Sequence, residues 1–329
     1  MTSTRLDRRS LLAAGAALLA APRLTLAQGN WPERPVRVIV PFTPGGSTDI
    51  LARSLAAELQ EMFGQTFVIE NRGGAGGTVG SEVVARSAPD GYTLMMGHIG
   101  TLAVNPSLYR GLSFDPATAF APIGLMAIVP NVLVVNPRKV AASNVQELIA
   151  LLKARPNAFT YGSGGNGSAA HTAMVAFMQA TGTQMEHVPY RGTGPMMNDL
   201  IAGTIDMTLT GGPAALPAAR NGLVRALGVS SLRRLSSAPD IPTIAEQGVT
   251  GFDATQWYGL VAPAGTPRPI IDRINDATKR ILSGPKLAPR LAAEGADAAP
   301  GTPEEYRDFI AAERTRWGEL IRATNMRAD

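Results

Sequence analysis

Two segments of the chain place a short apolar strand, a glycine-rich loop and an amphipathic helix directly one after another. In the first, residues 36–40 form a nearly all-apolar, β-branched run, typical of a strand buried on both faces of a sheet. Gly45 and Gly46 then allow the backbone to approach a ligand closely. Ser47 or Thr48 is expected to cap the helix that follows. One face of this helix carries its apolar residues, Leu51, Leu55, Leu59 and Met62.

The second segment repeats this arrangement in the middle of the chain. Residues 159–161 predict a short strand, 162–168 (GSGGNGS) a loop, and 169 to about 181 a helix. The first N–H groups of a helix have no partner inside it and can therefore bind an anion. Each loop alone is more often a plain turn, but two such loops suggest that two helix N-termini face one anionic ligand across a cleft.

The rest of the chain alternates strands and helices, which indicates an α/β protein with two domains. A strand at 132–135 marks the first crossing between the domains. The return crossing is expected to begin at 239–243, and a strand at 257–261 then joins the first sheet. Further strands are predicted at 66–69, 92–96, 185–188, 205–209 and 224–229, and terminal helices at 270–282 and 304–322.

Residues 1–27 have the pattern of an export signal. Arg5, Arg8 and Arg9 precede an apolar run at 11–21, and residues 25–27 resemble a small-residue cleavage site. The run is too short to span a bilayer, which disfavours a membrane anchor. The paired arginines favour twin-arginine export, although a general secretory signal is also compatible with them. We therefore expect a periplasmic protein.

Charge and composition argue against several functions. Without residues 1–27 the chain has 26 basic and 25 acidic residues, a net charge of +1, and no basic run that would bind nucleic acid. It contains no cysteine, so thiolate metal sites and thiol nucleophiles are excluded. Its three histidines, His98, His171 and His187, lack the spacing of a metal site, and we expect no cofactor.

The sequence also lacks the motifs of common hydrolases. It has no Gly-x-Ser-x-Gly elbow and no His-Glu-x-x-His pair. Asp49 and Ser163 are better explained as residues at helix starts than as catalytic groups. Arg191 is as compatible with a carboxylate contact as with a solvated position. Trp257 and Tyr258 could line the cleft, although at least one of them is expected in the core.

Several motifs together resemble the substrate-binding proteins of tripartite tricarboxylate transporters, the Bug-type receptors. The resemblance covers essentially the whole chain after the signal. It is carried by residues 41–49 (PFTPGGSTD), 71–77 (NRGGAGG), 90–94 (DGYTL), 105–109 (NPSLY), 161–171 (YGSGGNGSAAH), 188–192 (VPYRG), 239–243 (PDIPT) and 262–267 (APAGTP).

This resemblance implies a two-domain type II periplasmic binding protein fold, in which each domain is a mostly parallel sheet flanked by helices and a ligand cleft lies between them. The expected domains are 28–127 plus 251–329, and 128–250. The family positions, together with the loops at the strand ends, give the candidate ligand-binding residues Phe42, Gly45, Gly46, Ser47, Asp49, His98, Thr101, Ser163, Asn166, Gly167, Ser168, His171, Arg191, Gly192, Thr210 and Gly211.

The implied function is capture of a small organic carboxylate by hinge closure, without catalysis, by a monomer that then docks on membrane transporter subunits. Many members of this family carry an Asp or Asn pair near Thr210–Gly212, and its absence here disfavours an amino-acid ligand. Simple mono- or dicarboxylates, including aromatic ones, are preferred. Two alternatives stay open: a receptor for a signalling system, and an exported hydrolase that uses Ser163 or Ser47.

Overall fold

The computed structural model describes residues 31–328. The predicted export signal at 1–27 therefore lies outside the described residues. The fold and the site below belong to residues 34–328, which are part of one compact unit.

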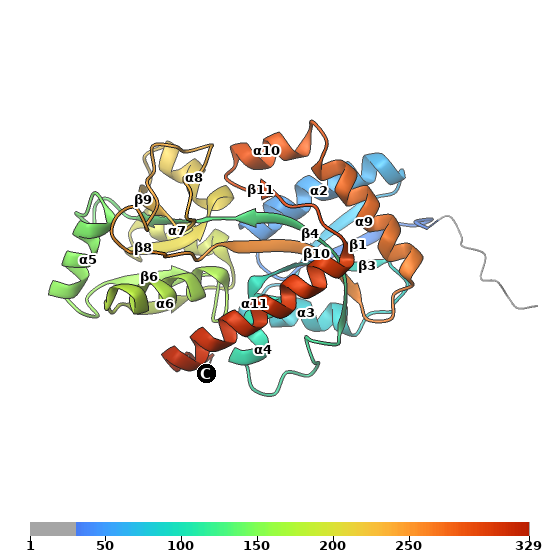
Figure 1. The fold of residues 1–329 in the computed structure, drawn as a ribbon, viewed down its shortest axis with the longest axis horizontal. Coiled ribbons are helices and arrows are strands. Elements are labelled where there is room, and N and C mark those ends of the chain that lie inside the picture. Colours follow the sequence, from blue (N-terminus) through green and yellow to red (C-terminus); the bar gives the residue numbers. More distant parts are fainter. Residues whose placement is uncertain (1–30, 329) are drawn as a thin grey trace, which may run out of the picture. The chain divides into compact units, whose positions relative to one another are not determined.

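The first lobe is built on a six-stranded sheet with the order β11-β4-β10-β3-β1-β2 (Figure 1). Its strands are β1 (Val36–Val40), β2 (Phe67–Asn71), β3 (Thr93–His98), β4 (Phe120–Val129), β10 (Gln256–Pro263) and β11 (Asp297–Ala298). Its helices are α2 (Ser47–Phe63), α3 (Thr78–Ala85), α4 (Asn105–Leu108), α9 (Arg268–Leu282), α10 (Leu287–Ala293) and α11 (Pro303–Thr324), with a 3₁₀ turn at Ala75–Gly77 and a π-helical turn at Gly100–Val104.

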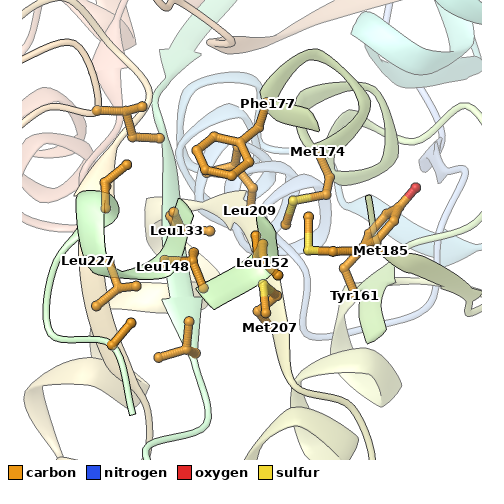
Figure 2. Packing of buried hydrophobic residues seen from close by; sticks show 14 of the residues in the cluster. Leu133, Leu148, Leu152, Tyr161, Met174, Phe177, Met185, Met207, Leu209 and Leu227 are labelled. Atoms are coloured by element: carbon orange, nitrogen blue, oxygen red, sulfur yellow. The ribbon is translucent and has the colours of Figure 1, made fainter. Parts of the chain in front are cut away.

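The second lobe is built on a five-stranded sheet with the order β7-β6-β8-β5-β9. Its strands are β5 (Asn131–Val135), β6 (Thr160–Ser163), β7 (Glu186–Pro189), β8 (Met207–Gly211) and β9 (Arg225–Val229). Its helices are α5 (Val145–Ala154), α6 (Ala169–Thr181), α7 (Thr193–Ala202) and α8 (Gly212–Arg220). Figure 2 shows the core formed where α5 and α6 pack on this sheet, with Leu148 and Leu152 facing Leu133 and Leu209.

The strands that lead from one lobe to the other run against their neighbours. In the first sheet, β1, β2, β3 and β4 share one direction, and β10 and β11 oppose them. In the second sheet, β6, β7, β8 and β9 share one direction and β5 opposes them. Most strands of each sheet are therefore parallel, and the predicted two-lobed α/β fold is confirmed.

The chain changes sheets between Val129 and Asn131, and again before Gln256. The predicted return at 239–243 is too early, because Ile244, Val249 and Phe252 still belong to the core of the second lobe. Their apolar side chains keep this segment on the second lobe until it reaches β10. The domain boundaries at 127/128 and 250/251 remain predictions.

Most predicted helix ends are correct, but one cap is not. Gly64 ends α2 in the left-handed conformation, and Thr302 with Glu305 forms a capping box at the start of α11. The N-cap of α2, however, is Gly46 without a side-chain cap, because Ser47 and Thr48 already belong to the first helical turn. Their hydroxyls are thereby available to the cleft. Helix α8 lies between the predicted strands at 205–209 and 224–229, where the sequence analysis places no helix.

Candidate functional site

The N-termini of three helices meet at one small cavity between the lobes. Ser47 and Thr48 open α2, Ala169 and Ala170 open α6, and Thr193 opens α7. The cavity is small: the space open to the centre of a water molecule is about 20 Å³. Its lining consists of Phe42, Ser47, Thr48, His98, Gly164, Ser168, Ala169, Ala170, Thr193, Thr210, Gln256 and Tyr258.

This lining provides hydrogen-bond donors from backbone N–H groups and neutral side chains. The first-turn N–H groups of each helix have no partner within the helix and carry its positive dipole end. Hydroxyl groups from both lobes surround them. Among the described residues that line the cavity, none is Asp, Glu, Lys or Arg. The cavity is therefore suited to an anion held by backbone N–H and neutral side-chain donors.

Asp49 holds the first-lobe loop in place and does not line the cavity. Its carboxylate accepts from the backbone N of Gly45 at 3.1 Å, from Asn71 Nδ2 at 2.9 Å and from Arg53 Nε at 3.1 Å. Burial would raise the pKa of Asp49, but the hydrogen bonds from Arg53, Asn71 and Gly45 keep it below its usual value. Asn71 also donates to the carbonyl oxygen of Phe42 at 3.0 Å, so the loop is fixed at both ends.

His98 ends β3 and presents a neutral ring to the cavity. Its Nδ1 accepts from the backbone N of Gly100 at 2.7 Å and of Thr101 at 3.3 Å, which leaves the proton on Nε2. Phe42 stacks on the ring with the centroids 4.5 Å apart. Burial lowers the pKa of His98 to about 4, so the ring is uncharged near neutral pH. The hydroxyl of Thr101 bonds to the backbone of His98 and supports the turn.

Ser163 and His171 hold the second-lobe loop in the same way. Ser163 Oγ accepts from the backbone N of Gly165 at 3.1 Å and lies 2.7 Å from His187 Nε2. His171 Nδ1 accepts from the backbone N of Gly167 at 3.1 Å, and its ring stacks on His187 with the centroids 4.1 Å apart. Ser163 has no exposed surface, so a substrate has no access to the Ser163–His187 contact.

The two lobes are closed against each other around the cavity. The hydroxyl of Tyr109 in the first lobe donates to the carbonyl oxygen of Asn166 in the second at 2.8 Å. Asn166 Nδ2 donates to the carbonyl oxygen of Ala328, after α11, at 2.7 Å. Glycines allow the backbones to meet: a Cβ added to Gly46 would lie 3.0 Å from the Cβ of Thr193. Loops of both lobes therefore enclose the site.

Five of the sixteen candidate residues line the cavity, namely Phe42, Ser47, His98, Ser168 and Thr210. Asp49, Thr101, Ser163 and His171 lie behind the loops, and Arg191 has an exposed side chain outside the lining. The other candidates shape the contact between the lobes or lie beside the cavity, namely Gly45, Gly46, Asn166, Gly167, Gly192 and Gly211.

Sequence reasoning missed several residues of the lining. Thr193 follows the Tyr190–Gly192 loop, and its place after a glycine could have marked it as a third helix start. Of the two neighbouring aromatic residues, Tyr258 lines the cavity and Trp257 lies in the core, which agrees with the expectation that at least one of them is buried in the core. No local signal distinguishes Gln256. The missed residues are Thr48, Gly164, Ala169, Ala170, Thr193 and Gln256.

Residues 31–328 contain no group of three or more His, Asp or Glu side chains that could hold a metal ion. In the same part of the chain, no helix is both long and apolar enough to cross a membrane.

Two α/β lobes that enclose a cavity lined by helix N-termini define a two-lobed solute-binding protein. The family described as "Tripartite tricarboxylate transporter family receptor" matches residues 51–326. The chain belongs to this receptor family.

Individual relatives agree with this assignment. Protein BugT of Bordetella pertussis is 38% identical over 307 residues, which cover 93% of each sequence. The structure of Rpa4515 of R. palustris with adipate matches with a TM-score of 0.88 and 37% identity, over 90% of this chain and 99% of that chain. MatC of Rhodopseudomonas palustris with bound malate matches with a TM-score of 0.84 and 33% identity, over 88% and 100%.

These comparisons confirm the predicted family. Since its members are receptors, they also confirm that the chain is a binding protein and not an enzyme. The hydrolase alternative built on Ser163 or Ser47 is thereby set aside.

Proposed function

We propose that the protein is a periplasmic receptor that captures a small organic carboxylate by hinge closure and delivers it to a tripartite membrane transporter. The observation that carries this proposal is the meeting of three helix N-termini at a cavity whose described lining residues include no charged side chain. The adipate and malate in the two related structures support a carboxylate ligand. Export by the signal at 1–27, the twin-arginine route and a monomeric state belong to the same proposal.

The enclosed geometry supports hinge closure. The cavity is small and is enclosed by loops of both lobes, so a dicarboxylate can enter only when the lobes separate. Contacts across the cleft, such as Tyr109 with Asn166, then form only in the closed state. A ligand that bridges both lobes stabilises that state through its higher affinity for it. An affinity in the micromolar range, about −8 kcal/mol, is sufficient for this role.

The ligand would be held by residues of both lobes. We expect its carboxylate oxygens at the first-turn N–H groups of α2 and α6, next to Ser47 and Ser168. A bulky side chain at Ser47, as in Ser47→Leu, should abolish binding because it fills the cavity. The fold should persist, because the substituted side chain lies at the cavity between the lobes. Unchanged affinity in this variant would contradict the assignment of the site.

A thermal-shift screen of the purified protein tests the proposed function. A ligand that binds only the folded state raises the unfolding midpoint. We expect a clear shift with one class among mono-, di- and tricarboxylates and aromatic acids, and none with amino acids. If no acid produces a shift after unfolding and refolding to remove a ligand carried through purification, the proposal is wrong. The thermal-shift result would be the same if the partner were a sensor protein instead of a transporter. A pull-down with the candidate transporter subunits distinguishes these two possibilities, because only a transporter receptor should bind them.

A further inference from the structure

The segment that follows α11 is anchored on the first lobe. After the last turn of α11, Asn325 adopts the left-handed conformation that ends the helix. The N–H of Met326 then donates to the carbonyl oxygen of Ile321 at 3.1 Å, which fixes the segment on the end of the helix. The side chains of Met326 and Ala328 are partly buried and pack against the core of the first lobe. We call residues 325–328 the strap.

The strap reaches the second lobe at Asn166. The Nδ2 of Asn166 donates to the carbonyl oxygen of Ala328 at 2.7 Å, and the carbonyl oxygen of Asn166 accepts from the hydroxyl of Tyr109 at 2.8 Å. Both partners belong to the first lobe. Asn166 lies in the loop at 162–168, which also supplies residues to the cavity lining. The strap therefore ties this loop to the first lobe beside the cavity.

Farther along the second lobe, a groove of about 490 Å³ separates the strap from α6. Met326 and Arg327 line this groove on one side, and Val175 and Met178 of α6 line it on the other. Because these side chains leave the space between them open, the lobes can separate here without disrupting a packed core. Separation of the strap from the second lobe does require that the hydrogen bond from Asn166 to the strap breaks.

We propose that the strap regulates the opening of the receptor by keeping part of the ligand-free molecules closed. This inference rests on the hinge closure of the proposed function. A contact that forms only when the lobes are together shifts the equilibrium between open and closed molecules toward the closed form. One neutral hydrogen bond changes such an equilibrium about two- to twelvefold. The residues of the strap are not part of the cavity lining, so the strap acts on closure without contacting the carboxylate.

Distances between spin labels in the ligand-free protein test the inference. Labels on cysteines introduced at Lys153 and Asp308 report the two lobes, and the structure provides the closed distance. We expect Asn166→Ala to lower the ratio of closed to open molecules at least threefold, because it removes the donor to the strap and keeps the carbonyl bond to Tyr109. A chain that stops after Asn325 should show at least the same reduction. Thermal unfolding checks that both variants are folded.

The effects of the two changes should not add. Without the strap the amide of Asn166 has lost its acceptor, so Asn166→Ala in the shortened chain should lower the ratio no further. If Asn166 only supported its own loop, the substitution would lower the ratio by the same factor in both chains. Gln146→Ala is the matched control, because its Nε2 also donates to a backbone carbonyl oxygen at 2.7 Å, that of Gln247 within the second lobe. It should leave the distances unchanged.

Three results would overturn the inference: a ligand-free wild type without closed molecules, a wild-type ratio in Asn166→Ala and the shortened chain, or equal effects of Asn166→Ala in both chains. Each of them leaves the carboxylate receptor standing, because the distances are measured without ligand. Failure of every carboxylate in the thermal-shift screen would overturn the proposed function itself and would leave the measured ratios as they are.

Discussion

The hydroxyl of Tyr109 donates to the carbonyl oxygen of Asn166 at 2.8 Å, and this bond joins the first lobe to the loop at 162–168 of the second. Burial raises the pKa of Tyr109 to about 12, so the proton that forms this bond is retained at all physiological pH values. The bond forms only when the lobes are together. If the proposed hinge closure holds, this bond should contribute to ligand affinity and not to the folding of either lobe.

Tyr109→Phe should weaken carboxylate binding about fivefold, the equivalent of about 1 kcal/mol for one hydrogen bond. The unfolding midpoint without ligand should hardly change. Tyr190→Phe is the control, because Tyr190 donates to Asp199 within the second lobe at 2.6 Å. Calorimetry should show a loss of affinity in the first variant alone. Equal losses in both would mean that the Tyr109 bond has no special role in closure.

Gly194→Ala should prevent full closure of the cleft. A Cβ at this position of α7 would overlap the carbonyl oxygen of Pro44 in the opposite lobe. The overlap disappears when the lobes separate, so the midpoint without ligand should be retained while affinity falls at least tenfold. In the control Gly318→Ala, the added Cβ meets only side-chain atoms of Ser107 and Arg322 in the first lobe. Wild-type affinity in Gly194→Ala would show that binding does not require this closed contact.

Thr43→Val should increase ligand affinity. Thr43 Oγ1 is buried and has no hydrogen-bond partner in the part of the chain that the structure describes. It lies where Gly192 of the second lobe approaches, so closure removes water from it. An unpaired buried hydroxyl costs about 1–3 kcal/mol, and valine removes this cost from the closed state. Calorimetry should give an affinity at least threefold higher than that of the wild type. A lower affinity would show that the hydroxyl contributes to binding.

The buried histidines should make stability depend on pH in the mildly acidic range. Burial lowers the pKa of His98 and His187 to about 4, and burial with the adjacent His187 lowers that of His171 to about 3. Below the unfolded value of 6.5 the unfolded chain binds protons that the folded protein does not. Stability is therefore fully present above about pH 7 and falls as the pH drops toward 4.

Each histidine contributes a slope of up to about 1.4 kcal/mol per pH unit. Denaturant unfolding at pH 5, 6 and 7 measures how much the free energy of unfolding falls between pH 7 and pH 5. In His98→Gln this fall should be smaller by about a third. A free energy of unfolding that stays constant from pH 7 to pH 5 would contradict the neutral buried state of these rings.

The parts of the fold that depend on local sequence could be predicted. The units at 36–63 and 159–181 were recognised because strand, glycine loop and helix follow one another without interruption. The capping box at Thr302 and Glu305 is also a local pattern. The return crossing was placed too early, because what keeps residues 244–254 on the second lobe is apolar packing against a distant core.

The site was predicted less completely because its geometry depends on partners far apart in the sequence. The sequence suggests Asp49 as a ligand contact, but in the structure Asn71 hydrogen-bonds to its carboxylate. In the same way, the hydroxyl of Ser163 is bonded to His187 and is not free for a ligand. Gln256 carries no motif at all. It reaches the cavity because β10 crosses between the lobes and Asn131 orients its amide. Contacts of this kind follow from the packing of the lobes, which periodicity does not reveal.

In the proposed mechanism, closure of the two lobes holds the carboxylate, so the distance between the lobes should change when the ligand binds. Because the chain contains no cysteine, spin labels can be placed at the exposed Asp308 of the first lobe and Lys153 of the second through two introduced cysteines. The distance between the labels, measured by electron-spin resonance, should be broadly distributed without ligand. It should become narrower and shift to the closed distance with saturating L-malate or the carboxylate that the thermal screen selects. A distribution that is unchanged while calorimetry shows saturation would contradict hinge closure.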